Sequence, residues 1–324
     1  MNRTASWGHV SRRDLGPRLS AMTGRFAPSP TGELHLGNLR TALIAWLAAR
    51  SAGETFLLRT EDLDVVAASD EHERAQQHDL RAIGIDWDGA VWRQRDRFPV
   101  YRDALRRLEE RGLTYECFCS RREIRESAAA PHGNAGLVYP GTCRDLSAAE
   151  RAARREEREP AIRFRSDGRL VEVDDVVAGR HPAAPHDVVL CRNDGVPAYN
   201  LAVVVDDAAQ GVDLVVRGDD LLPSTPSQVA ILGALGHPAP RYAHVPLVVG
   251  ADGRRLAKRD GAITLADLAS LGVSVDSVRS ALAVSIGLAE LGEAVGASEL
   301  VDRFDLGAVV ALGRDPISVK NLHL

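Results

Sequence analysis

The sequence lacks any apolar run approaching the roughly 18 residues that a membrane-spanning helix requires. Residues 1–20 contain basic side chains but no apolar core segment, which excludes a secretory signal of the usual kind. The 324 residues include only 4 cysteines, too few for a disulfide framework in a chain of this length. We therefore expect a protein of the reducing cytoplasm, where clustered cysteines more often bind metal than form disulfides.

An excess of positive charge is also missing. The chain has 40 Lys and Arg against 45 Asp and Glu, a net charge of −5. No overall basic surface is therefore expected, and contacts with nucleic acid would depend on local groups of arginines. There are two such groups: Arg121, Arg122 and Arg125, and Arg151, Arg154, Arg155 and Arg158. We interpret the second group as a solvated helix face, because glutamates alternate with it at helical spacing.

What the chain does contain is a regular alternation of apolar strands with helical segments, the pattern of a parallel sheet. The strands are predicted at residues 23–27, 55–60, 187–192, 198–205, 213–216 and 244–249. The helices are predicted at residues 36–51, 69–84, 99–112 and 224–235. We therefore predict an α/β fold built on a doubly wound parallel sheet.

The predicted sheet is divided by an insertion in which Cys, Gly, Pro and charged residues become dense. The expected organisation has a first catalytic half, the insertion, a second catalytic half and a short helical C-terminal segment. Their bounds are residues 23–115, 116–186, 187–262 and 263–324. We expect residues 1–22 to be a disordered extension, or to result from an upstream start codon with Met22 as the true start.

Residues 24–38 are the most informative segment. They predict a strand end, a Pro/Gly-rich turn and the N-terminus of an apolar helix. The free N–H groups of a helix N-terminus attract anions, so phosphate is the natural ligand. His35 stands at the start of this helix, where it can donate a hydrogen bond to phosphate. Gly37 has no side chain and would let a flat group such as a nucleobase approach the backbone.

Charged residues follow other predicted strands, and ligands of doubly wound sheets bind at the carboxyl ends of the strands. Arg25, Arg217 and Tyr199 would suit an acidic small molecule, since arginine binds carboxylates through two parallel hydrogen bonds. Glu61 could hold an ammonium group. Together they fit an amino acid with a side-chain carboxylate. Each also has a structural alternative: Tyr199 as core filler, Glu61 as a helix cap and Arg217 in an internal ion pair.

The segment His35-Leu36-Gly37-Asn38 resembles the HIGH motif of class I aminoacyl-tRNA synthetases. The preceding residues 25–32 (RFAPSPTG) look like the glutamate-specific branch of that family, and the resemblance extends over residues 24–261. It implies a Rossmann-like catalytic domain in which His35 is catalytic and binds ATP together with Gly37 and Asn38. The glutamate site that the resemblance implies consists of Arg25, Phe26, Ala27, Pro28, Ser29, Glu61, Tyr199 and Arg217.

Residues 253–261 follow the last predicted strand and resemble the mobile lysine loop of the same family, the KMSKS motif. Lys258 matches the family lysine, whereas Arg255 replaces the first lysine, Ala257 replaces the usual serine and Arg259 stands at the last position. The chemistry requires cations near the triphosphate as charge moves onto pyrophosphate. Lys258 is therefore expected to bind ATP and to act in catalysis. The loss of the serine hydroxyl would remove one contact.

Three cysteines of the insertion could bind a metal ion. Cys117, Cys119 and Cys143 supply thiolates, and a fourth donor would complete a tetrahedral zinc site. Two buried cysteines on a strand are the alternative, because C-x-C is not the usual spacing. The resemblance implies Tyr139 as the fourth ligand of a structural zinc, with His132 as a less favoured choice. Cys191, in a predicted strand, is expected to be a small core residue.

About sixty residues follow the lysine loop, fewer than the anticodon-binding region of a glutamyl-tRNA synthetase requires. The chain is therefore similar to truncated paralogues that glutamylate the queuosine base of tRNA(Asp). The resemblance implies ATP, L-glutamate and queuosine-bearing tRNA(Asp) as partners, with Mg²⁺ accompanying ATP. Asp206 and Asp207 are candidate Mg²⁺ ligands or strand-end caps. We expect a monomer.

Three other functions are considered: a compact enzyme that charges the 3′ end of tRNA(Glu), a nucleotidylyltransferase of related fold, and an inactive RNA-binding relative. The missing anticodon region argues against the first. The second would not need Arg25, Tyr199, Arg217 or the insertion. The presence of His35 and Lys258 argues against the third, whereas Arg255 and Ala257 in the lysine loop leave it open.

Overall fold

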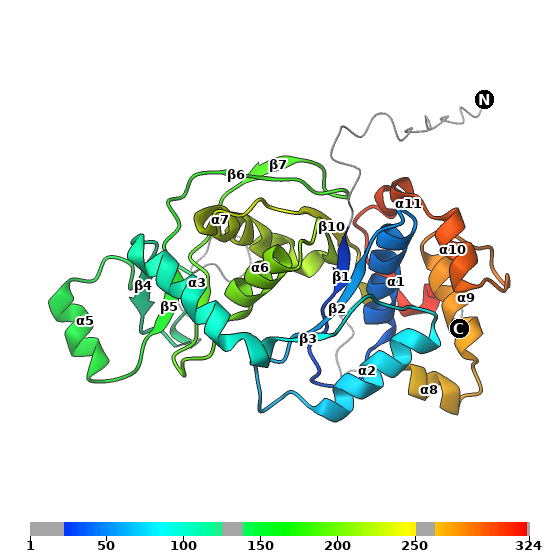
Figure 1. The fold of residues 1–324 in the computed structure, drawn as a ribbon, viewed down its shortest axis with the longest axis horizontal. Coiled ribbons are helices and arrows are strands. Elements are labelled where there is room, and N and C mark those ends of the chain that lie inside the picture. Colours follow the sequence, from blue (N-terminus) through cyan, green and yellow to red (C-terminus); the bar gives the residue numbers. More distant parts are fainter. Residues whose placement is uncertain (1–22, 121, 125–138, 251–262, 323–324) are drawn as a thin grey trace.

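The computed structural model describes residues 23–120, 122–124, 139–250 and 263–322 (Figure 1). Several predictions lie outside these residues: the extension at 1–22, the lysine loop with Lys258, the alternative ligand His132, and Arg121 and Arg125. None of the helices in the described ranges combines the length and hydropathy that crossing a bilayer demands.

A five-stranded parallel sheet forms the centre of the molecule, in the order β10-β9-β1-β2-β3. Its strands are β1 (Gly24–Phe26), β2 (Phe56–Thr60), β3 (Trp92–Arg93), β9 (Leu214–Gly218) and β10 (Arg241–Val245). From β1 the chain passes through β2 to β3 at one edge of the sheet. It then crosses to β9 on the other side of β1 and reaches β10 at the opposite edge. The sheet is therefore doubly wound, as predicted, and its switch point lies between β1 and β9.

Helices cover both faces of this sheet (Figure 1). One face carries α1 (Leu36–Arg50) and α2 (Asp70–Ala82), and the other carries α3 (Phe98–Glu110), α6 (Tyr199–Ala209) and α7 (Thr225–Leu235). Short 3₁₀ turns, η1 (Gln94–Arg97) and η2 (Asp219–Ser224), lead into α3 and α7. Eleven of the 15 residues of α1 are buried, because α1 lies between the sheet and the C-terminal helices.

The prediction of a strand at residues 198–205 is wrong, because this segment forms helix α6. Its residues from Leu201 to Asp207 are all buried between α3 and α7. A helix enclosed on every side carries the same uninterrupted apolar run as a buried strand, so periodicity does not separate the two. Tyr199 therefore stands at a helix N-terminus and not within a strand.

Two other predicted strands differ in detail. The segment predicted at 187–192 shortens to β8 (Val189–Cys191), which pairs with β5 outside the central sheet. The segment predicted at 244–249 is divided into β10, which starts earlier at Arg241, and β11 (Val248–Val249). Pro246 lies between them and has no N–H to continue the ladder. β11 instead pairs with β12 (Ile317–Ser318) near the C-terminus.

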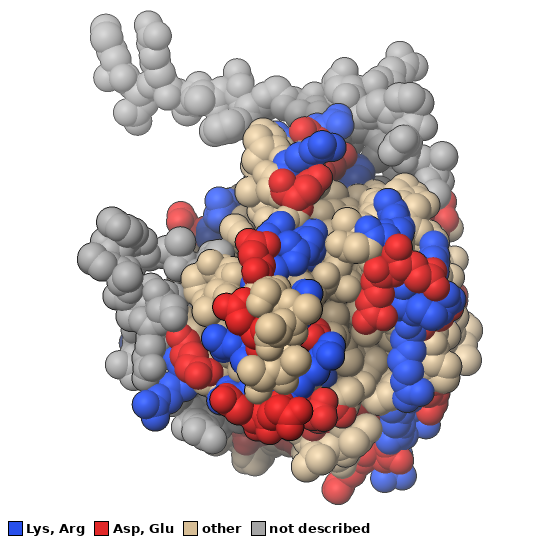
Figure 2. All heavy atoms as spheres, turned by 90° about the vertical axis from the view of Figure 1, so that its left-hand side faces the viewer, with Lys and Arg blue, Asp and Glu red and all other residues tan. Residues whose placement is uncertain are grey.

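A second, antiparallel sheet of β4 (Thr114–Cys117), β5 (Ala161–Phe164) and β8 lies at the left of Figure 1. The hairpin of β6 (Val171–Val173) and β7 (His181–Ala183) instead packs against α7, at the top of Figure 1. Helix α5 (Ala148–Arg155) lies next to the second sheet. In Figure 2 this end of the molecule shows acidic and basic side chains interspersed. Arg155 of α5 pairs with Glu116 of β4, and Arg158, which follows α5, pairs with Glu123. Both arginines are exposed, but their acidic partners lie outside the helix and not at helical spacing along it.

The C-terminal segment is mostly helical, as expected. It contains α8 (Leu265–Ser270), α9 (Val275–Ser285), α10 (Ala297–Arg303), α11 (Leu306–Ala311) and the turn η4 (Val319–Leu322). These helices extend the core around α1. Arg40 of α1 is buried there and donates to the Ser285 hydroxyl at 3.1 Å and to the Pro246 carbonyl at 3.1 Å.

Candidate active site

A cavity of about 620 Å³ opens at the carboxyl ends of β1 and β9. Its wall is formed by the segment from Arg25 to Asn38, by Glu61 after β2, by Tyr199 of α6 and by Arg217 of β9. This is the switch point of the sheet, where doubly wound folds bind their ligands. The structure thus brings the predicted HIGH-like motif and the predicted acid-binding residues to one cavity.

His35 caps the N-terminus of α1. Its Nδ1 accepts the N–H of Asn38 at 3.2 Å, and the Asn38 side chain accepts the N–H of His35 at 3.2 Å. Because Nδ1 is the acceptor, a neutral His35 carries its proton on Nε2, the nitrogen able to donate to an anion. A Cβ at Gly37 would lie only 3.0–3.1 Å from this imidazole. Glycine at position 37 therefore leaves room for the His35 ring. This is a second reason for glycine there, besides the close approach of a ligand.

The Pro/Gly-rich turn before His35 is fastened by a residue that the sequence did not single out. Gln76 of α2 is buried, and its amide donates to the carbonyls of Ser29 at 3.0 Å and Gly32 at 2.6 Å. The backbone of Glu61 also donates to Pro28, at 2.9 Å. Such contacts fix a loop that lacks regular structure, and its backbone can then be presented to a ligand in one shape.

Arg217 forms one wall of the cavity. Its Nε donates to Nε2 of His244 at 3.0 Å, its Nη2 to the Thr225 hydroxyl at 2.8 Å, and its Nη1 lies 3.4 Å from the Tyr199 hydroxyl. The predicted Arg217 and Tyr199 are therefore neighbours on the cavity wall. Burial raises the pKa of Tyr199, so its hydroxyl stays protonated and can donate. Sequence reasoning missed His244 and Thr225, for which no local pattern exists.

Arg25 has a different environment. Its Nε and Nη2 donate to Asp207 at 3.2 and 3.4 Å, and its Nη1 donates to the carbonyl of Val216 at 3.3 Å. Arg59 joins this cluster, with Nη2 at 2.8 Å from Asp207 and 3.3 Å from Glu61. Burial would raise the pKa of Asp207, but Arg25 and Arg59 together hold it below its usual value. Arg25 lines the cavity, yet all three of its guanidinium nitrogens are bound within the protein.

Burial raises the pKa of Glu61, and the nearby arginines oppose this effect. Asp206, its neighbour in the same cluster, accepts from Gln94 at 3.1 Å, Arg97 at 2.8 Å and Tyr101 at 2.7 Å. With Asp207 bound by two arginines, both aspartates of α6 have internal partners. They stabilise the packing of α6 against β1, β2 and α3, and the structure offers no support for them as Mg²⁺ ligands.

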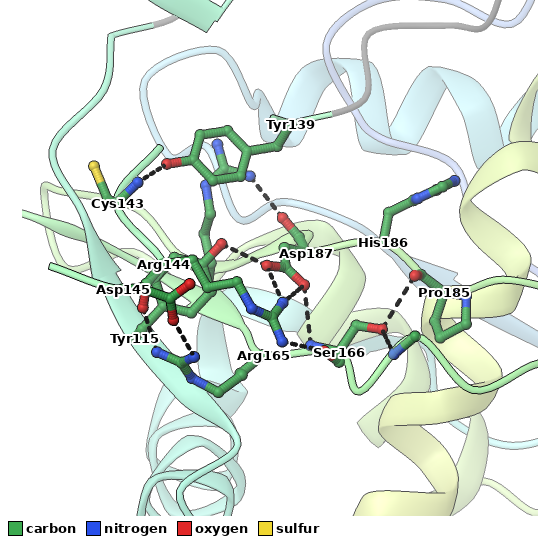
Figure 3. A network of polar contacts seen from close by, with 12 residues as sticks. Tyr115, Tyr139, Cys143, Arg144, Asp145, Arg165, Ser166, Pro185, His186 and Asp187 are labelled. Atoms are coloured by element: carbon green, nitrogen blue, oxygen red, sulfur yellow. Dashed lines mark hydrogen bonds and ion pairs between the residues drawn. The ribbon is translucent and has the colours of Figure 1, made fainter. Parts of the chain in front are cut away.

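The cysteine cluster lies in the second sheet, away from the cavity. The Sγ atoms of Cys117, Cys119 and Cys143 all lie within 4.8 Å of one another. The Tyr139 hydroxyl lies 3.6 Å from Sγ of Cys119 and accepts the N–H of Cys143 at 2.8 Å (Figure 3). Burial raises the pKa of the Cys119 thiol to about 11, so its thiolate form requires a neighbouring cation. Cys191 belongs to β8 and not to this group.

A buried network supports the cluster (Figure 3). Asp187 accepts from Arg144 at 2.6–2.8 Å, from the Tyr115 hydroxyl at 2.7 Å and from the backbone of Ser166 at 3.0 Å. Arg144 directly follows Cys143, so this ion pair fixes the loop that carries the third cysteine. The aromatic ring of Tyr139 stacks under Arg163 at 3.8 Å from the ring centroid. Cys143 and Tyr139 are thereby held in place by their surroundings.

The chain is similar to known proteins over most of its length. A family model described as "tRNA synthetases class I (E and Q), catalytic domain" matches residues 21–305. A protein of Nocardia farcinica named Glutamyl-Q tRNA(Asp) synthetase is 60% identical over 266 residues, which are 82% of this chain and 85% of that protein. A protein of Symbiobacterium thermophilum with the same name is 45% identical over 312 residues, 92% of this chain and 96% of that protein.

Among solved structures, a glutamate tRNA ligase from Elizabethkingia meningosepticum in complex with its amino acid superimposes with a TM-score of 0.76 at 28% identity. The match covers 93% of this chain and 68% of that ligase. The backbone of this chain therefore has the fold of that ligase over nearly all of its own length, and matches about two thirds of the ligase.

Proposed function

Because the chain belongs to the family of class I tRNA synthetases for glutamate and glutamine, we propose that it activates L-glutamate with ATP and transfers the glutamyl group to the queuosine base of tRNA(Asp). The observation that carries the activation step is the single cavity that joins the His35-capped helix N-terminus to Arg217 and Tyr199. The acceptor follows from relatives of 45–60% identity that bear the name Glutamyl-Q tRNA(Asp) synthetase.

In the first step, an α-carboxylate oxygen of glutamate attacks the α-phosphorus of ATP, and the bond to pyrophosphate breaks. The N–H of Gly37 in the first turn of α1, the positive end of the helix dipole and Nε2–H of His35 would stabilise the negative charge on the phosphates, because the N–H groups of Leu36 and Asn38 donate to Ile263 and His35. We assign nucleotide contacts to Gly37 and Asn38 as well. Lys258, from the sequence motif, would stabilise the departing pyrophosphate, with ATP supplied as its Mg²⁺ complex.

We assign glutamate to Arg25, Glu61, Tyr199 and Arg217, together with the backbone of residues 26–29. Arg217 and the Tyr199 hydroxyl are suited to the side-chain carboxylate, because both present donors at the cavity wall. Glu61 is suited to the ammonium group. Arg25, which Asp207 and the Val216 carbonyl hold in one position, would form part of the wall against which glutamate binds.

In the second step, a hydroxyl of the queuosine cyclopentene ring attacks the carbonyl carbon of glutamyl-adenylate, and AMP leaves. The ester bond replaces the mixed anhydride, and the proton of the hydroxyl is released. No nucleophile from the protein is required, because the anhydride is already activated. Water must be kept from the adenylate until the acceptor hydroxyl has reacted.

We also propose that Cys117, Cys119, Cys143 and Tyr139 hold one structural zinc ion in an inserted subdomain of residues 116–186. Ligand atoms of a tetrahedral zinc site lie about 3.8 Å apart, given Zn–S bonds of about 2.3 Å. The sulfur separations of up to 4.8 Å fit this spacing after a small contraction. When bound, the ion would fasten β4 to the loop that carries Cys143. It takes no part in the reaction steps.

Transfer of labelled glutamate tests the proposed function. Purified tRNA(Asp), with and without queuosine, is compared with tRNA(Glu) as acceptor. Label on queuosine-containing tRNA(Asp) alone is the expected result. Label on tRNA(Glu) would instead identify a compact charging enzyme. A glutamate-dependent ATP–pyrophosphate exchange assay separates activation from transfer, and Lys258→Ala should abolish most of that exchange.

A further inference from the structure

Behind the cavity wall lie two buried polar side chains to which the proposed reaction gives no role. Asp175, in the connection between β6 and β7, contacts His244 of β10, and His244 contacts Arg217 of β9. We infer that Asp175 and His244 are positioning residues that direct Arg217 toward a substrate carboxylate and keep its charge available. This inference rests on the proposed function, because it concerns how that site recognises glutamate.

The geometry is direct. His244 and Arg217 are register neighbours on adjacent parallel strands, and Nε of Arg217 donates to Nε2 of His244 at 3.0 Å. Nδ1 of His244 lies 2.5 Å from Oδ2 of Asp175, and both side chains are 0% exposed. The hydroxyl of Thr225 holds Nη2 of Arg217 at 2.8 Å. Nε and Nη2 of Arg217 are thus held by His244 and Thr225. The third nitrogen, Nη1, donates to the Tyr199 hydroxyl in the cavity wall.

The position of one proton decides whether this arrangement holds. The Asp175 carboxylate can only accept, so the proton of a neutral His244 lies on Nδ1. Its Nε2 then carries the lone pair that accepts the Arg217 N–H. Burial lowers the pKa of His244 and Arg217 lowers it further, against the opposing effects of Asp175 and Asp219. The imidazole therefore stays neutral beside the guanidinium.

Because His244 is neutral, it does not offset the positive charge of Arg217. Arg25 and Arg59 each contact the Asp207 carboxylate, which offsets their charge. Arg217 contacts an imidazole and two hydroxyls, and no ion pair joins it to a carboxylate anywhere in the described ranges. Of the two described arginines that line the cavity, Arg217 is therefore the one whose charge is left for a ligand. An acidic residue in place of His244 would fix the same geometry but consume that charge.

The substitution Asp175→Asn tests the inference. Oδ1 of Asp175 accepts the backbone N–H groups of Val177 at 2.8 Å and Ala178 at 2.7 Å. An asparagine would keep its oxygen there and direct its NH₂ group at Nδ1 of His244. The His244 proton would then move to Nε2 and oppose the Arg217 N–H, the wrong-tautomer effect known from catalytic triads. We expect the KM for glutamate to rise about tenfold in ATP–pyrophosphate exchange, with the KM for ATP unchanged.

Asp174→Asn is the matched control, because Asp174 is adjacent, half-exposed and 3.7 Å from Arg241. It should leave both KM values unchanged. ¹⁵N spectra of the histidine ring give a second readout, with the proton on Nδ1 in the unaltered protein and on Nε2 in Asp175→Asn. Kinetics of Asp175→Asn equal to those of Asp174→Asn, or a lower melting temperature with unchanged KM values, would overturn the inference.

A second pair of variants covers the case in which Asp175→Asn does not fold. The amide oxygen of a glutamine can reach the position of Nε2, whereas an asparagine reaches only that of Nδ1. His244→Gln should therefore keep more glutamate affinity than His244→Asn, and equal glutamate KM values would contradict the inference. Absence of glutamate-dependent exchange in the unaltered protein would defeat the proposed function itself. The ring spectra would still test the link between Asp175 and His244.

Discussion

Arg25 and Arg217 illustrate how the environment of a single side chain sets its role. Both are buried arginines on neighbouring strands at the cavity. Arg25 is bound by Asp207, and removal of Asp207 would leave the charge of Arg25 buried without a partner. Arg217 is held by neutral groups and keeps its charge for a ligand. The same residue type thus stabilises the fold in one position and is suited to recognition in the other.

Asp79 provides a prediction about pH. Burial raises the pKa of Asp79 to about 6, and Glu33 adds to the effect. An acid whose pKa is raised on folding binds more protons in the folded state, so its contribution to stability falls as pH rises from about 4 to about 6. Asp79→Asn should therefore raise the melting temperature at pH 7.5 by a few degrees, about 1 kcal/mol after allowance for solvent screening.

The gain should shrink toward pH 4.5, and thermal melts at both pH values measure it. Glu33→Gln serves as the background control, because it removes the second cause of the shift. In that background Asp79→Asn should gain less. An equal gain at both pH values would show that the charge of Asp79 is not responsible.

At the scale of elements, the N-termini of two helices shape the site. His35 and Asn38 cap α1 reciprocally, a local arrangement that the sequence alone could indicate. Helix α6 could not be recognised in the same way. Its Ala198 N-cap makes no side-chain hydrogen bond, and its apolar run reads equally as a strand. The packing of this segment between α3 and α7 is what makes it helical.

The second sheet carries a prediction about metal. Cys119→Ser should remove bound zinc and lower the melting temperature by several degrees, because metal binding and the folding of its site are coupled. Cys191→Ser is the control, since Cys191 lies in β8 of the same sheet but outside the cluster. Metal analysis of the purified proteins measures both. Zinc that persists in Cys119→Ser, or is lost in Cys191→Ser, would contradict the assignment of ligands.

Over the whole molecule, the C-terminal helices and the catalytic sheet share one core. Leu282 of α9 and Leu300 of α10 belong to the same buried cluster as α1 and β1. Arg40 crosses this interface, and burial lowers its pKa to about 10. The C-terminal helices therefore act as a structural support for the helix whose N-terminus faces the cavity.

Leu282→Ala tests whether the C-terminal helices and the catalytic sheet unfold together. Leu282 is 0% exposed, so its truncation should cost about 2–5 kcal/mol. Unfolding in urea, followed by circular dichroism and by tryptophan fluorescence, should remain a single coincident transition. Leu291→Ala is the control, because Leu291 is 67% exposed and should change stability by less than about 0.5 kcal/mol. Separate transitions would mean that the C-terminal helices unfold independently.

The sequence by itself determined the features that depend on neighbouring residues. These are the alternation of strands and helices, the capped helix at His35 and the motifs that carry the family resemblance. Tertiary structure alone decided that residues 198–205 are helical, that β8 leaves the central sheet and that Asp207 neutralises Arg25. The link from Asp175 to His244 spans 69 residues. Such contacts depend on how distant elements pack, and no local pattern in the chain encodes them.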